Sequence, residues 1–219
     1  MKRVVTIDGP AGAGKSTVAR KLADRLGWRL LDTGAMYRAV TLAALRDRLD
    51  LQNDQALGEL AAKLDVQLPE GRVLLNGEDV SEAIRTVEVT QATRFSADSP
   101  SVRRRLVDWQ RHFVESFREV VTEGRDQGTI VFPDAYRKFY LTASHDERAR
   151  RRHAEFVARG VAISLETVLK DVIERDAHDS AREIAPMKAA DDARRIDSTG
   201  LDLDEVVRLI EREILEPTG

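Results

Sequence analysis

The chain has 219 residues, 42% apolar and 33% charged, and it has no apolar run of the roughly 18 residues that a membrane span needs. Its 35 basic and 38 acidic residues give a net charge of −3, which argues against bulk binding of nucleic acid. Because cysteine is absent, a disulfide framework, a thiolate zinc site and a thiol nucleophile are excluded.

The first predicted elements are a strand and a helix. The run RVVTIDG at 3–9 is rich in β-branched residues and stops at glycine, and 16–26 carries apolar residues at helical spacing. The opening MKRVVTIDG enters this strand directly, without the apolar region and cleavage site of a signal peptide. We therefore expect a cytoplasmic location.

Between this strand and helix lies a phosphate-binding motif, G-x-x-x-x-G-K-[ST]. Its glycines let backbone N–H groups turn inward, the helix N-terminus adds a positive dipole, Lys15 reaches the β and γ phosphates, and Ser16 ligates Mg²⁺. A chance glycine-rich turn is the alternative. The expected nucleotide-binding residues are Gly9, Pro10, Ala11, Gly12, Ala13, Gly14, Lys15, Ser16 and Thr17.

The same alternation of strand and helix continues along the chain. Further strand-like runs lie at 28–34, 120–126, 138–144 and 193–200, and helical patterns follow most of them. Five such strands predict an α/β fold with a parallel sheet covered by helices on both faces. The stretch LDVQLPEGRVLLNGEDV at 64–80 instead predicts an antiparallel hairpin around a Pro-Glu-Gly turn, placed as an insertion outside the main sheet.

The segment LLDTGAMYR at 30–38 marks a second strand-to-helix junction. Thr33 lies at the junction, and Tyr37 and Arg38 follow one helical turn later. Such junctions face the crevice at the carboxyl edge of a parallel sheet, where an arginine can clamp a second phosphate. A solvated Arg38 and a core Tyr37 are the alternative.

Four motifs together resemble the bacterial cytidylate kinase family: IDGPAGAGKST, LLDTGAMYR, EGRDQGTIVFPDA and ERDAHDSAREIAP. The resemblance runs in order from Val5 to about Val207. It implies the fold of nucleoside monophosphate kinases as one domain over 1–219. It also implies a core at 1–38, 96–147 and 172–219, a monophosphate-binding insert with a small antiparallel sheet at 39–95, and a short lid at 148–171.

The resemblance also implies an acceptor site. Asp126 is directed at the base, where a carboxylate accepts a hydrogen bond from the amino group of cytosine but meets the carbonyl oxygen of uracil. Arg175, Asp179 and Arg182 have helical spacing that puts them on one face, with Asp179 at the sugar. Taken alone, the Asp126 turn fits a self-bonded loop, and the Arg-Asp-Arg spacing a surface ion-pair ladder. The expected CMP-binding residues are Thr33, Tyr37, Arg38, Arg94, Arg103, Arg125, Asp126, Arg175, Asp179 and Arg182.

The basic run ERARRRHAEFVARG at 147–160 has acidic partners and a single Phe among its charges. We interpret it as a helix leading into the lid, with Arg151 and Arg152 nearer to ATP than Arg148. Two departures from the family pattern lie at the acceptor site: Arg94 stands where a small hydroxyl residue is usual, and Gln127 replaces an apolar residue. Either change could alter the selectivity for base and sugar.

The predicted activity is transfer of the γ-phosphoryl group of ATP·Mg²⁺ to CMP or dCMP by a monomeric enzyme with small-molecule substrates. Because a phosphate monoester is already largely ionised near neutral pH, no general base is needed. The remaining catalytic work is to position the substrates and neutralise their charge. The residues expected to do this are Lys15, Arg125, Arg151, Arg152, Arg175 and Arg182. The alternatives are UMP or another monophosphate as acceptor, and a nucleotide-binding switch or ATPase.

Overall fold

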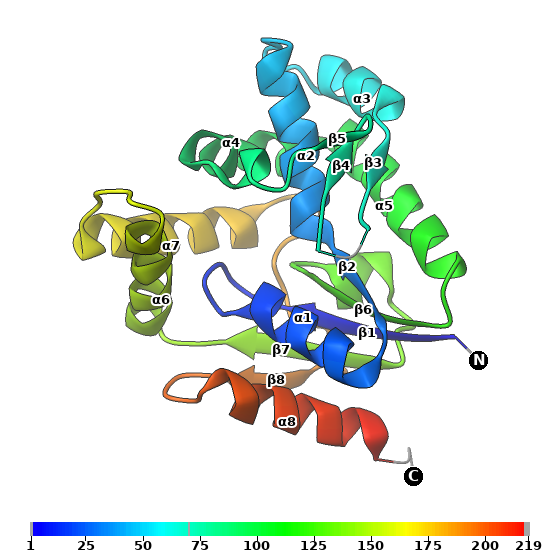
Figure 1. Cartoon of the computed structure of the whole chain (residues 1–219), viewed down its shortest axis with the longest axis vertical. Helices are drawn as coiled ribbons and strands as arrows, with labels where there is room; N and C mark the ends of the chain where they lie inside the picture. Colours follow the sequence, from blue (N-terminus) through cyan, green and yellow to red (C-terminus); the bar gives the residue numbers. More distant parts are fainter. Residues whose placement is uncertain (1, 70, 217–219) are drawn as a thin grey trace. The chain divides into compact units, whose positions relative to one another are not determined.

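The computed structural model describes residues 2–69 and 71–216 (Figure 1). The chain divides into two compact units, Met1–Leu30 with Phe117–Gly219 and Leu31–Ser116. The expected insert at 39–95 falls within the second unit and the expected lid at 148–171 within the first. The bounds of these subregions, and their grouping in one domain, stay predictions.

A five-stranded sheet has the order β2-β6-β1-β7-β8. Its strands are β1 (Arg3–Asp8), β2 (Arg29–Asp32), β6 (Glu119–Gly124), β7 (Arg137–Thr142) and β8 (Arg194–Asp197). β1 pairs in parallel with β6 and β7, and β7 pairs in parallel with β8. The predicted parallel sheet is confirmed, and the central place of β1 puts the loop after it between two other strand ends.

Helices α1 (Lys15–Leu26) and α8 (Leu203–Leu215) pack on this sheet (Figure 1). Leu22 of α1 and Ile210 of α8 are fully buried in one core with Phe139 and Leu141 of β7. Burying each of these side chains stabilises the fold by about 1.5–3 kcal/mol. At the start of α8, Asp202 and Glu205 form a reciprocal capping box. The helix that carries the phosphate-binding motif is therefore anchored by apolar contacts on its far face.

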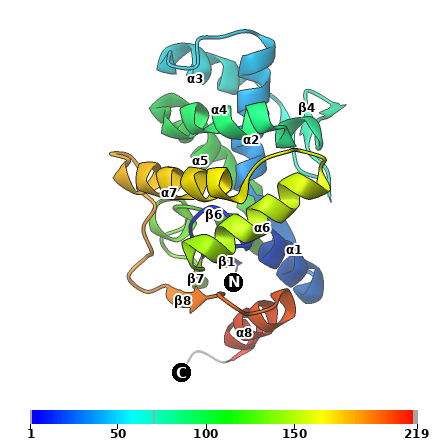
Figure 2. The same cartoon turned by 90° about the vertical axis from the view of Figure 1, so that its left-hand side faces the viewer.

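Helices α6 (His145–Ala158) and α7 (Leu165–Ala181) lie alongside each other and share a small core (Figure 2). Ala149 of α6 contacts Val168 and Val172 of α7 there. Ser144 and Ser164 cap the two helices by accepting hydrogen bonds from backbone N–H groups. The basic run at 147–160 is thus helical, as predicted, as far as Ala158.

The second unit contains α2 (Thr33–Arg46), α3 (Asp54–Lys63), η1 (Ala83–Arg85), α4 (Val87–Asp98) and α5 (Pro100–Glu115). It also has a three-stranded antiparallel sheet of β3 (Val66–Gln67), β4 (Leu74–Leu75) and β5 (Glu78–Asp79). The predicted hairpin corresponds to β3 and β4, and β5 extends it. Glu70, in the expected Pro-Glu-Gly turn, lies outside the described residues. Along residues 2–69 and 71–216, no helix combines the length and apolar character that crossing a membrane requires.

Candidate active site

The predicted phosphate-binding loop lies between β1 and α1. Gly14, at the N-cap of α1, has a φ of 87°, and Gly12 has a φ of +76°. A side chain at Gly12 would place Cβ 3.0 Å from the backbone oxygen of Arg148, so any other residue would be strained by this close approach to α6 and by the positive φ. The Nζ of Lys15 donates to the carbonyl of Pro10 (2.8 Å), which holds this side chain across the loop.

Glu123, near the end of β6, contacts the phosphate-binding loop, and the sequence analysis did not predict it. It is the buried penultimate residue of β6, and its carboxylate accepts a hydrogen bond from Oγ of Ser16 (3.0 Å). The signal that could have found it is an acidic residue at the end of an apolar strand, because such ends face the crevice of a parallel sheet.

The Ser16 and Glu123 pair fits Mg²⁺, which prefers oxygen ligands and usually binds through one or two carboxylates together with substrate phosphates. No cluster of three or more His, Asp or Glu side chains able to hold a metal occurs among the described residues. A metal held jointly with a nucleotide does not need such a cluster.

Lys15 and Asp8 are buried charges beside each other. Lys15 is 5% exposed and Asp8 3%. Burial lowers the pKa of Lys15 to about 7, and the positive charge of Arg125 lowers it further. The negative charges of Glu123 and Asp8 act in the opposite direction and raise this pKa. Burial raises the pKa of Asp8 to about 7, while the N–H groups of Gly128 and Gln127 act against that rise. Such opposed shifts of neighbouring groups are typical of catalytic sites.

Arg148 supports the phosphate-binding loop from α6. Its guanidinium is buried and donates to the carbonyls of Ala11 (2.9 Å) and Ala143 (3.0 Å). It also forms an ion pair with Asp176 of α7 (2.6 Å). One arginine thus links two helices and the loop, and it satisfies a carbonyl of the loop.

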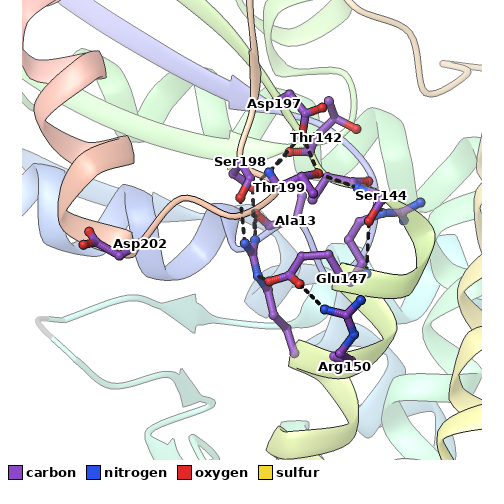
Figure 3. Close-up of polar contacts among 12 residues, drawn as sticks. Ala13, Thr142, Ser144, Glu147, Arg150, Asp197, Ser198, Thr199 and Asp202 are labelled. Atoms are coloured by element: carbon purple, nitrogen blue, oxygen red, sulfur yellow. Dashed lines mark hydrogen bonds and ion pairs between the residues drawn. The ribbon is translucent and has the colours of Figure 1, made fainter.

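Arg151 forms a second link of the same kind, to Ala13, Glu147 and Ser198, which are labelled in Figure 3. Its guanidinium donates to the Oγ (3.0 Å) and carbonyl (2.8 Å) of Ser198 and to Glu147 (2.9 Å), and it lies 3.5 Å from the carbonyl of Ala13. Arg152 instead lies over the ring of Phe156, 5.1 Å from its centre. A direct contact of Arg151 and Arg152 with ATP stays a prediction.

A compact ionic cluster joins the end of β6 to the end of α7. Asp179 is buried and accepts hydrogen bonds from Nε of Arg125 (3.1 Å) and Nη2 of Arg182 (2.6 Å). Burial acts to raise the pKa of Asp179, but the positive charges of Arg125, Arg182 and Arg175 outweigh it and lower that pKa. Three cations around one carboxylate leave a surplus of positive charge suited to an anionic ligand.

The prediction that Arg175, Asp179 and Arg182 share one helix is wrong for Arg182. α7 ends at Ala181, and Arg182 is its C-cap in an extended conformation. The chain turns away because Pro186 has no N–H to donate to the carbonyl of Arg182, and Ala185 before it is left-handed (φ 53°). Arg182 nevertheless reaches Asp179 from beyond the helix end.

Asp126 begins a single π-type turn at Gln127–Val131. Asp126 is 5% exposed, and its backbone carbonyl accepts hydrogen bonds from the N–H groups of Ile130 (2.9 Å) and Val131 (3.3 Å). The Gln127 side chain is buried and accepts from Oγ1 of Thr122 on β6 (3.0 Å). This departure from the family pattern is therefore bonded to the strand that precedes the turn.

In the second unit, the start of α2 presents three predicted acceptor-site residues. Thr33 is the first residue of the helix, and Tyr37 and Arg38 follow one turn later, with Asp32 as the N-cap. Nη2 of Arg38 lies 3.6 Å from Oδ1 of Asp32. The buried Nε of Arg38 has no hydrogen-bond partner among the described residues, which leaves a donor for an anion.

The other two predicted residues of this unit lie on α4 and α5. Arg103 is buried on α5, 3.5 Å from the carbonyl of Ala97. Arg94 is exposed on α4, where its guanidinium lies 4.9 Å from the ring centre of Phe95. The joining of these residues with those of the first unit in one acceptor site stays a prediction.

Known proteins resemble this chain over nearly its whole length. The model of the cytidylate kinase family matches residues 5–216. A cytidylate kinase of Exiguobacterium sibiricum is 49% identical over 94% of this chain and 95% of that protein. Those of Shewanella loihica (46%; 97% and 94%) and Pseudomonas aeruginosa (47%; 95% and 93%) are similarly close.

Solved structures resemble the fold at lower identity. An uncharacterized protein from Eubacterium ventriosum matches with a TM-score of 0.55 and 14% identity over 99% of this chain and 100% of that one. A gluconokinase from Sinorhizobium meliloti matches with a TM-score of 0.50 and 15% identity over 97% and 91%. The family match covers each of the four motifs described above, and the chain belongs to the cytidylate kinase family.

Proposed function

We propose that this enzyme transfers the γ-phosphoryl group of ATP to CMP or dCMP and so forms ADP with CDP or dCDP. One observation carries the proposal best: the end of β6 serves both substrates. Glu123 accepts from Ser16 of the phosphate-binding loop, while Arg125, two residues later, is bonded to the buried Asp179. The donor and acceptor groups thus follow each other on one short stretch of backbone.

The donor is held by the loop at 9–17. Its inward N–H groups and the N-terminus of α1 bind the phosphates, and Lys15 leaves the carbonyl of Pro10 to bind the β and γ phosphates. Ser16 and Glu123 would hold Mg²⁺, which neutralises phosphate charge when it is bound. Arg148 and Arg151 keep the loop carbonyls turned outward, so the N–H groups remain available.

The acceptor base is recognised by Asp126. A buried carboxylate accepts a hydrogen bond from the amino group of cytosine, whereas the carbonyl oxygen of uracil would repel it. A hydrogen bond to a charged group contributes about 1.5–3 kcal/mol. This difference gives the enzyme its preference for CMP over UMP.

The acceptor phosphate is clamped by arginines of the first unit. Arg125, Arg175 and Arg182 surround Asp179, which orients them and binds the sugar. In the second unit, the further residues proposed to bind CMP are Thr33, Tyr37 and Arg38 of α2, Arg94 of α4 and Arg103 of α5. Since the phosphate is already ionised, these residues catalyse by alignment and by stabilising the charge of the transferring group.

We further propose that the enzyme is a cytoplasmic monomer without a nucleic-acid partner. All the residues proposed to bind the substrates come from one chain, which supports the monomer. The net charge of −3 argues against a nucleic-acid partner, and the absence of cysteine is compatible with a reducing compartment. Light scattering at micromolar concentration tests the oligomeric state, and a monomer should have a mass of 24.5 kDa. A mass twice as large would contradict it.

The test of the activity is ADP release from ATP and Mg²⁺ with a panel of nucleoside monophosphates. CMP and dCMP should give the highest kcat/KM, with UMP well below them. Turnover no faster with CMP or dCMP than without an acceptor would refute the kinase proposal. A preference for UMP would keep the phosphoryl transfer and refute the role of Asp126.

A further inference from the structure

Asp8 is the last residue of β1 and connects this strand directly to the turn that follows Asp126. Its Oδ1 accepts a hydrogen bond from the N–H of Gln127 (2.9 Å), and its Oδ2 accepts one from the N–H of Gly128 (2.7 Å). The residue is almost completely buried, and the phosphate-binding loop begins at the next residue. One carboxylate thus holds two successive amides of a turn about 120 residues away.

The turn also lies directly against β1 at Gly128. A Cβ at this position would lie 2.9 Å from Oγ1 of Thr6, 3.2 Å from Cδ of Lys138 and 3.4 Å from Oδ2 of Asp8. Contacts below 3.0 Å force a neighbour to move. On its other side the turn is held by the bond from Thr122 to the Gln127 side chain. The backbone after Asp126 is therefore fixed from both neighbouring strands.

We propose that Asp8 is a positioning residue for the acceptor base: by holding the amides of Gln127 and Gly128, it sets the backbone from which Asp126 reaches cytosine. This inference rests on the proposed role of Asp126. Because Asp8 directly precedes the phosphate-binding loop, the same contact ties the position of the base-recognition turn to that of the donor site. Selectivity for cytosine then depends on a residue that does not itself touch the acceptor.

The two bonds are strongest when Asp8 is ionised, because a carboxylate offers two full acceptors to two donors. The charged and titratable groups that face it are Lys15 from α1, Asp126 from the turn and Tyr140 from β7. Burial and the charge of Asp126 raise the pKa of Asp8 to about 7. The hydrogen bonds from the two amides and the charge of Lys15 act to lower it. Loosening of the turn is therefore expected as the pH falls through neutrality.

The test is the ratio of kcat/KM for CMP to kcat/KM for UMP between pH 6 and 8. Both acceptors carry the same phosphate, so the ratio cancels the ionisation of that phosphate and of the donor site. In the unaltered enzyme the ratio should rise with pH through about 7. In Asp8→Asn, which keeps one acceptor oxygen, it should be about tenfold lower at pH 8 and independent of pH.

Asp197→Asn is the matched control. Asp197 also ends a strand and accepts from a backbone N–H two residues later, that of Thr199, but at β8. This variant should keep both the ratio and its pH dependence. A ratio in Asp8→Asn equal to that of the unaltered enzyme at pH 8 would overturn the inference, as would a ratio independent of pH in the unaltered enzyme.

A second pair of variants leaves the Asp8 carboxylate in place. Gly128→Ala should lower the ratio because its methyl group pushes the turn away from Thr6. Thr6→Ala added to Gly128→Ala should restore the ratio. It removes the nearest atom, and Oγ1 of Thr6 has no hydrogen-bond partner in the described part of the chain. An unchanged ratio in Gly128→Ala would contradict the inference even if Asp8→Asn failed to fold.

The outcomes also separate this inference from the proposed function. If the unaltered enzyme does not phosphorylate CMP, or prefers UMP, the proposed function or the role of Asp126 fails first. If it prefers CMP while Asp8→Asn and Gly128→Ala keep that preference, only the positioning role of Asp8 fails.

Discussion

Lys15 is a buried ammonium group whose protein partners do not fully compensate its charge. It donates to one carbonyl, and burial lowers its pKa to about 7. A triphosphate brought beside it supplies the missing negative charge and raises the pKa again. Binding of ATP·Mg²⁺ and protonation of Lys15 are therefore coupled.

Because Lys15 is largely neutral at pH 8, ATP·Mg²⁺ binding at that pH should take up protons, approaching one per nucleotide. Calorimetry in two buffers with different ionisation enthalpies measures this number. Lys15→Met should abolish most of the uptake. Lys21→Met, which removes a partly exposed lysine paired with Asp204, should leave it unchanged. Proton release on binding would contradict the assignment.

Asp126 is the second residue whose chemistry can be tested alone. Asp126→Asn keeps the shape of the side chain but offers an N–H₂ group that suits the O4 of uracil. The kcat/KM ratio of CMP to UMP should fall by about tenfold to a hundredfold, while the KM for ATP stays within about twofold. Steady-state assays with each acceptor measure both quantities, and an unchanged ratio would remove Asp126 from base recognition.

At the scale of elements, α6 supports the phosphate-binding loop through Arg148. This buried guanidinium donates to two carbonyls and forms an ion pair with the partly buried carboxylate of Asp176. Breaking a buried ion pair leaves an uncompensated charge and is more costly than losing a surface pair. The support is therefore a large contribution to the stability of the first unit.

Arg148→Met should lower the free energy of unfolding by about 3–5 kcal/mol. Arg150→Met is the control, since Arg150 is exposed and pairs with Glu147, and it should cost less than about 1 kcal/mol. Urea unfolding followed by circular dichroism measures both. Equal costs for the two variants would show that Arg148 is not the main link between α6 and the loop.

Four of the five strands could be predicted because each contains a short apolar run that ends near glycine or a polar turn. β8, with the sequence RRID, was predicted from its place in the alternation of strand and helix. The third strand of the small sheet, β5, could not, because Glu78 and Asp79 are exposed and show no alternation. The π-type turn at Gln127–Val131 was also beyond sequence reasoning, since it depends on distant bonds from Asp8. Arg182 was misplaced because helical spacing was extended one residue past Ala181, the last residue of α7.

The candidate site was predicted best where chemistry is carried by a local motif, as at Lys15 and Ser16. Glu123 and Asp8 were missed because their partners lie more than 100 residues away. Both are acidic residues near the ends of neighbouring parallel strands, β6 and β1. A charge that ends an apolar strand is thus a usable signal for the edge of the sheet where ligands bind.

For the whole molecule, the buried carboxylate of Asp8 opposes stability. Unfolded, this group ionises near 3.8, and folded, near 7. Between these values the folded state binds a proton that the unfolded state has lost, so the contribution of Asp8 to stability falls as the pH rises. The total loss is at most about 4 kcal/mol, at about 1.4 kcal/mol per pKa unit. A functional carboxylate retained at such a cost fits the trade-off between stability and activity.

We therefore expect the free energy of unfolding of the unaltered enzyme, relative to Asp8→Asn, to decrease from pH 4.5 to 7.5 by about 2–4 kcal/mol. Above about pH 7.5 the difference should be constant. Urea titrations of both proteins across this range measure it. Parallel curves would mean that the folded pKa of Asp8 is close to its ordinary value.

In the proposed reaction, ATP passes its terminal phosphoryl group to CMP and not to water. The most direct measurement is a single-turnover reaction of enzyme, Mg²⁺, CMP and ATP labelled in its γ-phosphoryl group, with the products separated by chromatography. The label should appear in the β position of CDP. Label found mainly in inorganic phosphate, with CMP unchanged, would contradict it.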